Sequence, residues 1–140
     1  MVAREKARRV LSELLDCLSD LERYRDRLTP AELRESRDAQ HMVLRALYVA
    51  AQSAVDLAMH VAADAGLPQA ATYGDAFRRL AESGRIDRAL AERLAGWAGF
   101  RNVLARSYAV LDLDRFFQTL SETGDLERFA AFVAGEIGPA

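Results

Sequence analysis

The sequence contains few of the residues that form disulfides, turns or strands. Its 140 residues include one cysteine, three prolines and eight glycines, and valine, isoleucine and threonine are sparse beside alanine, leucine, arginine and glutamate. A lone cysteine excludes an internal disulfide and fits a reducing compartment. Because β-branched residues and helix breakers are rare, the composition favours helices throughout.

An excess of one charge is also missing. Nineteen basic residues stand against 21 acidic ones, which gives a net charge of −2. This balance excludes a global polycation, so any contact with RNA has to come from a local patch. With 51% apolar residues, the chain is long enough to bury a core, and we expect one domain over residues 1–140.

No long uninterrupted apolar run is present. The N-terminal segment, MVAREKARRV, is charged and lacks the apolar core of a signal peptide. The most apolar stretch, residues 42–65, is interrupted by charged and strongly polar residues. These are Arg45, Gln52, Asp56, His60 and Asp64. Such a stretch suits a central bundle helix better than a membrane span, so we expect a soluble, cytoplasmic protein that does not associate with a membrane.

Apolar residues at helical spacing predict an all-α, up-and-down bundle of four long helices plus one short helix. The expected helices cover about residues 4–28, 30–65, 73–83, 88–108 and, from Asp112 or Asp114, to about residue 137. Thr29 and Pro30 form an N-cap and first helical position, and Gly66 is the expected end of the second helix. Gly124 and Asp125 could kink or split the last helix.

One arginine interrupts the apolar stripe of the fourth expected helix. The stripe consists of Leu90, Leu94, Trp97, Leu104 and Tyr108, and the position that completes it is Arg101. Arg101 could extend its charge to the helix end or pair with a carboxylate such as Asp38 or Asp56. Alternatively it faces a cleft with Asn102, Arg106 and Tyr108 and binds an anion there.

Metal and nucleophile chemistry have little support in the sequence. Di-metal bundles use Glu-x-x-His pairs, and neither His41 nor His60 has a glutamate three residues before it. Cys17 lies among leucines and reads as a buried apolar side chain rather than a reactive thiol. We therefore expect no metal and no cofactor.

Residues 99–112 read GFRNVLARSYAVLD. This segment, within residues 76–112, resembles the HepT-like branch of the HEPN superfamily, whose motif is GFRN-x-L-x-H-x-Y followed by an aspartate. The chain matches the motif at Gly99, Phe100, Arg101, Asn102, Leu104, Tyr108 and Asp112. Upstream, residues 66–68 (GLP) and 72–77 (TYGDAF) resemble a second family segment, and residues 45–60 resemble its long second helix. The family's histidine position holds Arg106 here.

The resemblance implies an HEPN-like bundle that acts as a metal-independent ribonuclease toxin of a toxin–antitoxin pair. It implies a homodimer in which the motifs of two subunits meet, with Arg101 holding the RNA phosphate and Asn102 orienting the site. It also implies a minimal nucleotidyltransferase antitoxin as partner, which transfers AMP to Tyr108. Without the resemblance, Tyr108 reads equally well as an interface residue that packs and hydrogen-bonds across a dimer.

Arg106 changes what the implied site can do. Its guanidinium has a pKa above about 12 and offers no base at neutral pH, whereas general acid–base catalysis typically contributes about 10²–10⁴-fold. We therefore predict weak or absent cleavage, with RNA phosphate still bound by Arg101 and Arg106. The alternative is a non-catalytic HEPN module that binds a nucleotidyltransferase or a nucleotide. Aromatic residues on the motif face, Trp97, Phe100 and Tyr108, favour a dimer in either case.

Overall fold

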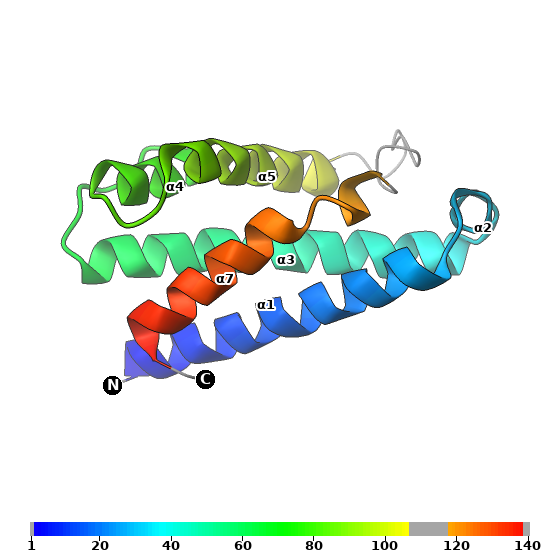
Figure 1. The fold of residues 1–140 in the computed structure, drawn as a ribbon, viewed down its shortest axis with the longest axis horizontal. Coiled ribbons are helices and arrows are strands. Elements are labelled where there is room, and N and C mark those ends of the chain that lie inside the picture. Colours follow the sequence, from blue (N-terminus) through cyan, green and yellow to red (C-terminus); the bar gives the residue numbers. More distant parts are fainter. Residues whose placement is uncertain (1, 107–117, 139–140) are drawn as a thin grey trace.

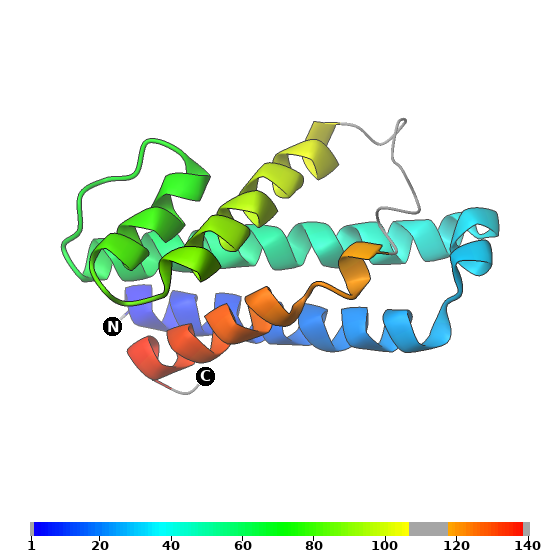
Figure 2. The same cartoon turned by 45° about the horizontal axis from the view of Figure 1, so that its top comes forward.

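The computed structural model describes residues 2–106 and 118–138, and the statements below refer to these residues. They form helices with no strand, in the order α1 (Val2–Arg27), α2 (Pro30–Glu35), α3 (Arg37–Asp64), α4 (Tyr73–Glu82), α5 (Arg88–Arg106) and α7 (Gly124–Ile137). Figures 1 and 2 show α1, α5 and α7 packed around α3, with α1 and α3 running in opposite directions. The predicted all-α bundle is confirmed.

Helix α3 forms the centre of the bundle. Its buried face carries small residues at helical spacing, among them Ala46, Ala50, Ala54 and Ala58, which let neighbouring helices approach closely. Of the described helices, α3 is the one with the length and mean hydropathy to cross a membrane, but 61% of that apolar window is buried inside the bundle. Its hydropathy is therefore that of a core helix.

The start of the second expected helix is confirmed, but its continuity is not. Thr29 accepts a hydrogen bond at 3.1 Å from the N–H of Glu32, as an N-cap does, with Pro30 following. The helix expected over residues 30–65 is interrupted at Ser36, whose backbone is extended (φ −103°, ψ 110°). The Ser36 hydroxyl accepts a hydrogen bond from the N–H of Ala39 at 3.1 Å and so begins a new helix. The prediction of one helix was wrong because a serine side chain competed with the helical backbone.

The other predicted ends hold where the structure describes them. After α3, Gly66 has a φ of +70° and Leu67 donates to the carbonyl of Ala62 at 2.9 Å, which closes the helix with a left-handed residue. In the last expected helix, α7 begins at Gly124, so the alternative of a split at that point is the one observed. The expected starts at Asp112 and Asp114 lie outside the described residues.

Helix α4 packs on the bundle through a close contact with α5 and an aromatic pair with α7. A β-carbon at Gly74 would lie 3.3 Å from the β-carbon of Ala95 on α5, so the two helices meet closely at this glycine. Phe77 is fully buried and its ring meets that of Phe129 on α7 edge to face, with centroids 5.2 Å apart. These contacts place Tyr73, the first residue of α4, beside α5.

Candidate anion site around Arg101

Arg101 lies in the core stripe of α5, as predicted. Leu94, Trp97 and Leu104 of this stripe are buried, while Arg101 is half-buried among them. The guanidinium of Arg101 contacts residues of α3 and α4 that are distant in sequence. An arginine in this position has to satisfy its N–H groups locally, because the cost of burying them without partners is high.

Three neutral oxygens accept hydrogen bonds from Arg101. Its Nε donates to Gln52 Oε1 at 2.6 Å and its Nη2 donates to the Tyr48 hydroxyl at 3.2 Å, both on α3. Its Nη1 donates to Asn102 Oδ1 at 3.0 Å. A guanidinium has more N–H groups than these three acceptors use, so the described residues do not occupy all of its donors.

Two tyrosine rings also face the guanidinium. The Cζ of Arg101 lies 5.4 Å from the ring centroid of Tyr48 and 5.4 Å from that of Tyr73. Both distances fall within the range of cation–π attraction. Tyr73 is 38% exposed, so the cluster reaches the surface at the start of α4.

No carboxylate among the described residues forms an ion pair with Arg101. Pairing with Asp38 or Asp56, one of the two alternatives drawn from the sequence, is therefore not seen in this part of the chain. Asp56 is linked to the site indirectly, because it accepts a hydrogen bond at 2.8 Å from Gln52 Nε2. Among the described residues, the side chains that accept hydrogen bonds from Arg101 are therefore neutral.

The remaining predicted site residues are placed only in part. Asn102 is exposed and hydrogen-bonded to Arg101. Arg106 is the last residue of α5, five positions after Arg101. Tyr108 lies outside the described residues. Tyr48, Gln52 and Tyr73 were not predicted from the sequence, since only the fold brings these residues of α3 and α4 to Arg101.

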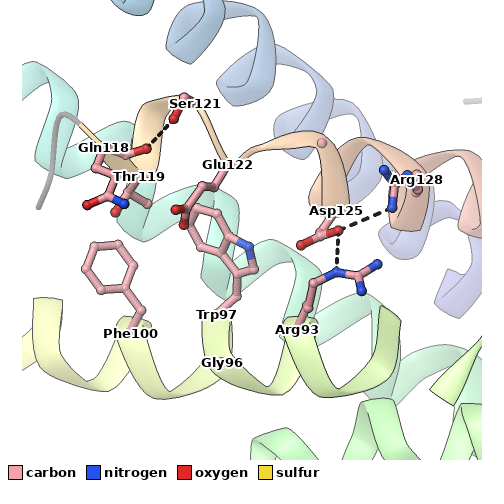
Figure 3. Close-up of a pocket in the computed structure, with 11 residues that line it drawn as sticks. Arg93, Gly96, Trp97, Phe100, Gln118, Thr119, Ser121, Glu122, Asp125 and Arg128 are labelled. Carbon is pink, nitrogen blue, oxygen red and sulfur yellow. Dashed lines mark hydrogen bonds and ion pairs between the residues drawn. The ribbon is translucent and has the colours of Figure 1, made fainter. Parts of the chain in front are cut away.

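A hollow lies between α5 and the start of α7, and Arg101 is not among its lining residues. It has a volume of about 950 Å³, and Figure 3 shows its aromatic wall, Trp97 and Phe100, facing residues 118–125. Trp97 is only 7% exposed and packs edge to face on Phe100, with centroids 5.8 Å apart. The expectation that Trp97 adds exposed aromatic surface for a dimer was wrong, because the core stripe buries it.

The charges in this hollow differ from those around Arg101. Asp125 accepts from Arg93 Nε at 2.9 Å and from Arg128 Nη1 at 3.4 Å, so both arginines have a carboxylate partner (Figure 3). Glu122 adds a further negative charge to the lining. The two arginines and two carboxylates that line this hollow therefore balance in charge.

The described residues provide neither a candidate metal site nor an activated thiol. Residues 2–106 and 118–138 hold no group of three or more His, Cys, Asp or Glu side chains that could bind a metal ion. Cys17 is buried, and burial together with the nearby Glu13 carboxylate raises the pKa of its thiol to about 11. The cluster of chemical interest is the one around Arg101.

The described residues thus form a helical bundle with a half-buried arginine on α5. A family model described as "Ribonuclease HepT-like" matches residues 14–134, and the chain belongs to that family. No curated protein sequence matches the chain.

Solved structures share this fold. A tri-AMPylated Shewanella oneidensis HEPN toxin in complex with MNT antitoxin is 20% identical, with a TM-score of 0.81 over 91% of this chain and 96% of that one. A toxin–antitoxin complex with AMP-PNP gives a TM-score of 0.82 at 20% identity over the same shares. The cytosolic protein of unknown function YutE from Bacillus subtilis gives 0.74 at 14% identity, covering 93% of this chain and 92% of its own. At these identities the likeness shows the fold.

Proposed function

We propose that this chain is the HEPN-type toxin of a toxin–antitoxin pair, a metal-independent ribonuclease whose cleavage is weakened by Arg106. We further propose that residues 1–140 form a single HEPN domain that works in the cytoplasm. Membership of the HepT-like family supports the ribonuclease ancestry. The observation that carries the proposal is the guanidinium of Arg101, which is held by neutral acceptors.

In this proposal Arg101 binds the phosphate that is cleaved. Cleavage of RNA without a metal requires a base for the 2′-hydroxyl, positive charge on the phosphorane and an acid for the leaving oxygen. Arg101 supplies the positive charge, and its planar N–H groups suit two phosphate oxygens at once. Asn102, which accepts from Arg101 Nη1, helps to orient the guanidinium.

Arg106 lacks the proton chemistry that completes such a reaction. A histidine titrates near neutral pH and can give and take a proton, whereas a guanidinium stays charged. We therefore assign Arg106 a binding role, as a second positive charge near the phosphate. RNA is bound in this arrangement but cleaved slowly.

The test compares RNA cleavage by the full chain and by Arg106→His. We expect the variant to cleave about 10²–10⁴-fold faster, the usual contribution of general acid–base catalysis. Adding Arg101→Gln to Arg106→His is the matched control and should abolish the gain. Equal cleavage by the chain and the Arg106→His variant would show that the histidine argument is wrong.

We propose a minimal nucleotidyltransferase antitoxin as the partner, with Tyr108 as the residue that receives AMP. The support is a solved HEPN toxin of the same fold that is AMPylated and bound to an MNT antitoxin. AMP on Tyr108 would bring negative charge and bulk near Arg101 and compete with RNA. Mass spectrometry after incubation with the cognate nucleotidyltransferase and ATP should show the adduct, and Tyr108→Phe should lack it. An adduct that is absent from the unaltered chain would exclude this role and favour an interface tyrosine.

We also propose a homodimer in which two copies of the motif meet. Arg101 and Arg106 of both copies would then act on one RNA strand. Sedimentation of the purified chain should give about twice the 15.5 kDa of the monomer. A monomer at all concentrations would exclude a composite site.

Arg106 also favours a second candidate, a non-catalytic HEPN module that binds a nucleotidyltransferase or a nucleotide. Expression of Arg106→His in a bacterial host separates the two. Toxicity that appears with histidine indicates a disabled ribonuclease, while a variant as harmless as the unaltered chain indicates a dedicated binding module.

A further inference from the structure

We propose that Tyr48, Gln52 and Tyr73 are positioning residues that fix the guanidinium of Arg101 and leave its positive charge available to a phosphate. We call these three residues the neutral holder. The proposal rests on the proposed function, in which Arg101 binds RNA phosphate. It adds residues from α3 and α4 to a site that the sequence confined to α5.

Gln52 is the central member of the neutral holder because its amide is bonded at both ends. Its Oε1 accepts from Arg101 Nε at 2.6 Å, and its Nε2 donates to Asp56 Oδ1 at 2.8 Å. A flipped amide would point its NH₂ group at a guanidinium that only donates, and its oxygen at a carboxylate that only accepts. Asp56 therefore fixes which end of Gln52 faces Arg101.

The two tyrosines restrict the guanidinium in other directions. Tyr48 both accepts from Arg101 Nη2 at 3.2 Å and places its ring 5.4 Å from Cζ, and Tyr73 places a second ring at the same distance. The two rings limit the movement of the guanidinium, and its N–H groups that are not bonded to the three acceptors remain for a ligand. Such N–H groups bind a phosphate with up to two hydrogen bonds.

Two other arginines on α4 and α5 are bonded to carboxylates rather than to neutral oxygens. Arg78 donates to Glu92 at 2.8 Å and Arg93 donates to Asp125 at 2.9 Å, so a carboxylate offsets each charge. Gln52 occupies the equivalent place beside Arg101, with an oxygen of similar size but no charge. The neutral oxygen orients the arginine without competing electrostatically with an anionic ligand.

Gln52→Glu tests this distinction because it keeps the shape of the side chain and adds a charge. The assay measures the affinity of the full chain for a labelled single-stranded RNA oligonucleotide over a range of salt concentrations. We expect the affinity of Gln52→Glu to fall about tenfold, because the added carboxylate weakens the charged hydrogen bond from Arg101 to the phosphate. The plot of log affinity against log salt should become shallower by about 0.7 for each RNA phosphate that the variant no longer neutralises.

Matched variants separate charge from orientation and from misfolding. Gln52→Glu with Asp56→Asn removes repulsion between the two neighbouring carboxylates, and it should still bind weakly with the shallower salt dependence. Gln52→Leu removes the acceptor without adding charge, so it should bind less tightly with the salt dependence of the unaltered chain. Asp56→Asn alone should bind as well as the unaltered chain or better.

Arg101→Gln makes the two possible failures distinguishable. If Arg101→Gln binds RNA as tightly as the unaltered chain, the proposed function of Arg101 is wrong. If Arg101→Gln binds weakly but both variants that carry Gln52→Glu bind normally, the neutral holder is wrong while the proposed function stands. A fall in affinity for Gln52→Glu with unchanged salt dependence would likewise overturn the proposal, because it would indicate a structural effect alone.

Discussion

Thr72 caps the helix that brings Tyr73 to Arg101, so removal of its hydroxyl tests how the site is assembled. Its backbone is extended (φ −134°, ψ 166°), and its Oγ1 accepts a hydrogen bond from the N–H of Asp75 at 3.2 Å. Thr72→Ala removes this acceptor, and loss of an N-cap costs about 1 kcal/mol of stability. For a chain of 140 residues this lowers the melting temperature by about 3 °C.

The same substitution should reach the candidate site. Tyr73 is the first residue of α4, and a loosened first turn allows its ring to leave the position 5.4 Å from Arg101. A change of about 1 kcal/mol corresponds to roughly a fivefold change in an equilibrium constant, which is the upper limit we expect for the loss of RNA affinity. Thermal unfolding and RNA binding are measured on the same preparations.

Two control variants isolate the effect on the site. Thr72→Ser keeps the capping oxygen and should melt and bind like the unaltered chain. Ser36→Ala removes an equivalent acceptor at the start of α3, where Ser36 Oγ accepts from Ala39 at 3.1 Å. Tyr48 lies about 18 Å further along that helix by ideal geometry, so Ser36→Ala should lower stability without weakening binding. Equal loss of RNA affinity in both alanine variants, or no loss of stability in Thr72→Ala, would refute the reasoning.

Other parts of the fold give predictions of their own. Phe77→Leu and Phe129→Leu should each destabilise the chain by about 1 kcal/mol. A double-mutant cycle measured by urea unfolding should give a coupling free energy of about 0.5–1.5 kcal/mol for the pair of rings. Additive effects of the two substitutions would contradict the contact between the rings. Hydrogen bonds from Arg78 lower the pKa of the Asp75 and Glu92 carboxyl groups. The stability that these two ion pairs contribute is therefore present above about pH 4, and it is lost as the pH falls through the lowered pKa values of the folded chain. The urea-unfolding curves of the unaltered chain and Arg78→Ala should therefore converge in acid, and a constant difference at every pH would contradict this. Burial raises the pKa of the Cys17 thiol to about 11, so iodoacetamide should modify it far more slowly in the folded chain than in urea, and equal rates would count against its burial.

Local sequence signals predicted much of the fold because their physical causes are local. Thr29 with Pro30 and Gly66 mark helix ends through hydrogen bonds within a few residues, and the structure places ends there. The apolar stripe of α5 also follows from helical spacing alone. The break at Ser36 was missed, since a serine inside a helical pattern is compatible with either a continuous helix or a new N-cap. The buried side chain of Leu33 and the bond from Gln40 to its carbonyl at 2.9 Å are consistent with the break.

Only the part of the candidate site that lies on α5 was predictable from the sequence. Spacing identified Arg101 as the exception on an apolar face, and it left open whether a carboxylate or a ligand compensates the charge. Tyr48 and Gln52 lie about 50 residues away in sequence, where only the packing of α3 on α5 can select them. The burial of Trp97 was likewise a property of the assembled bundle.

Asp125 has a consequence for the direction from which a ligand reaches α5. Near Trp97 this helix carries arginines on two sides, Arg93 toward α7 and Arg101 toward α3. The carboxylate of Asp125 forms ion pairs with Arg93 and Arg128, and so weakens the attraction of the α7 side for anions. If Arg101 binds RNA phosphate as proposed, Asp125 and Glu122 reduce the competition for that phosphate from the arginines on the α7 side.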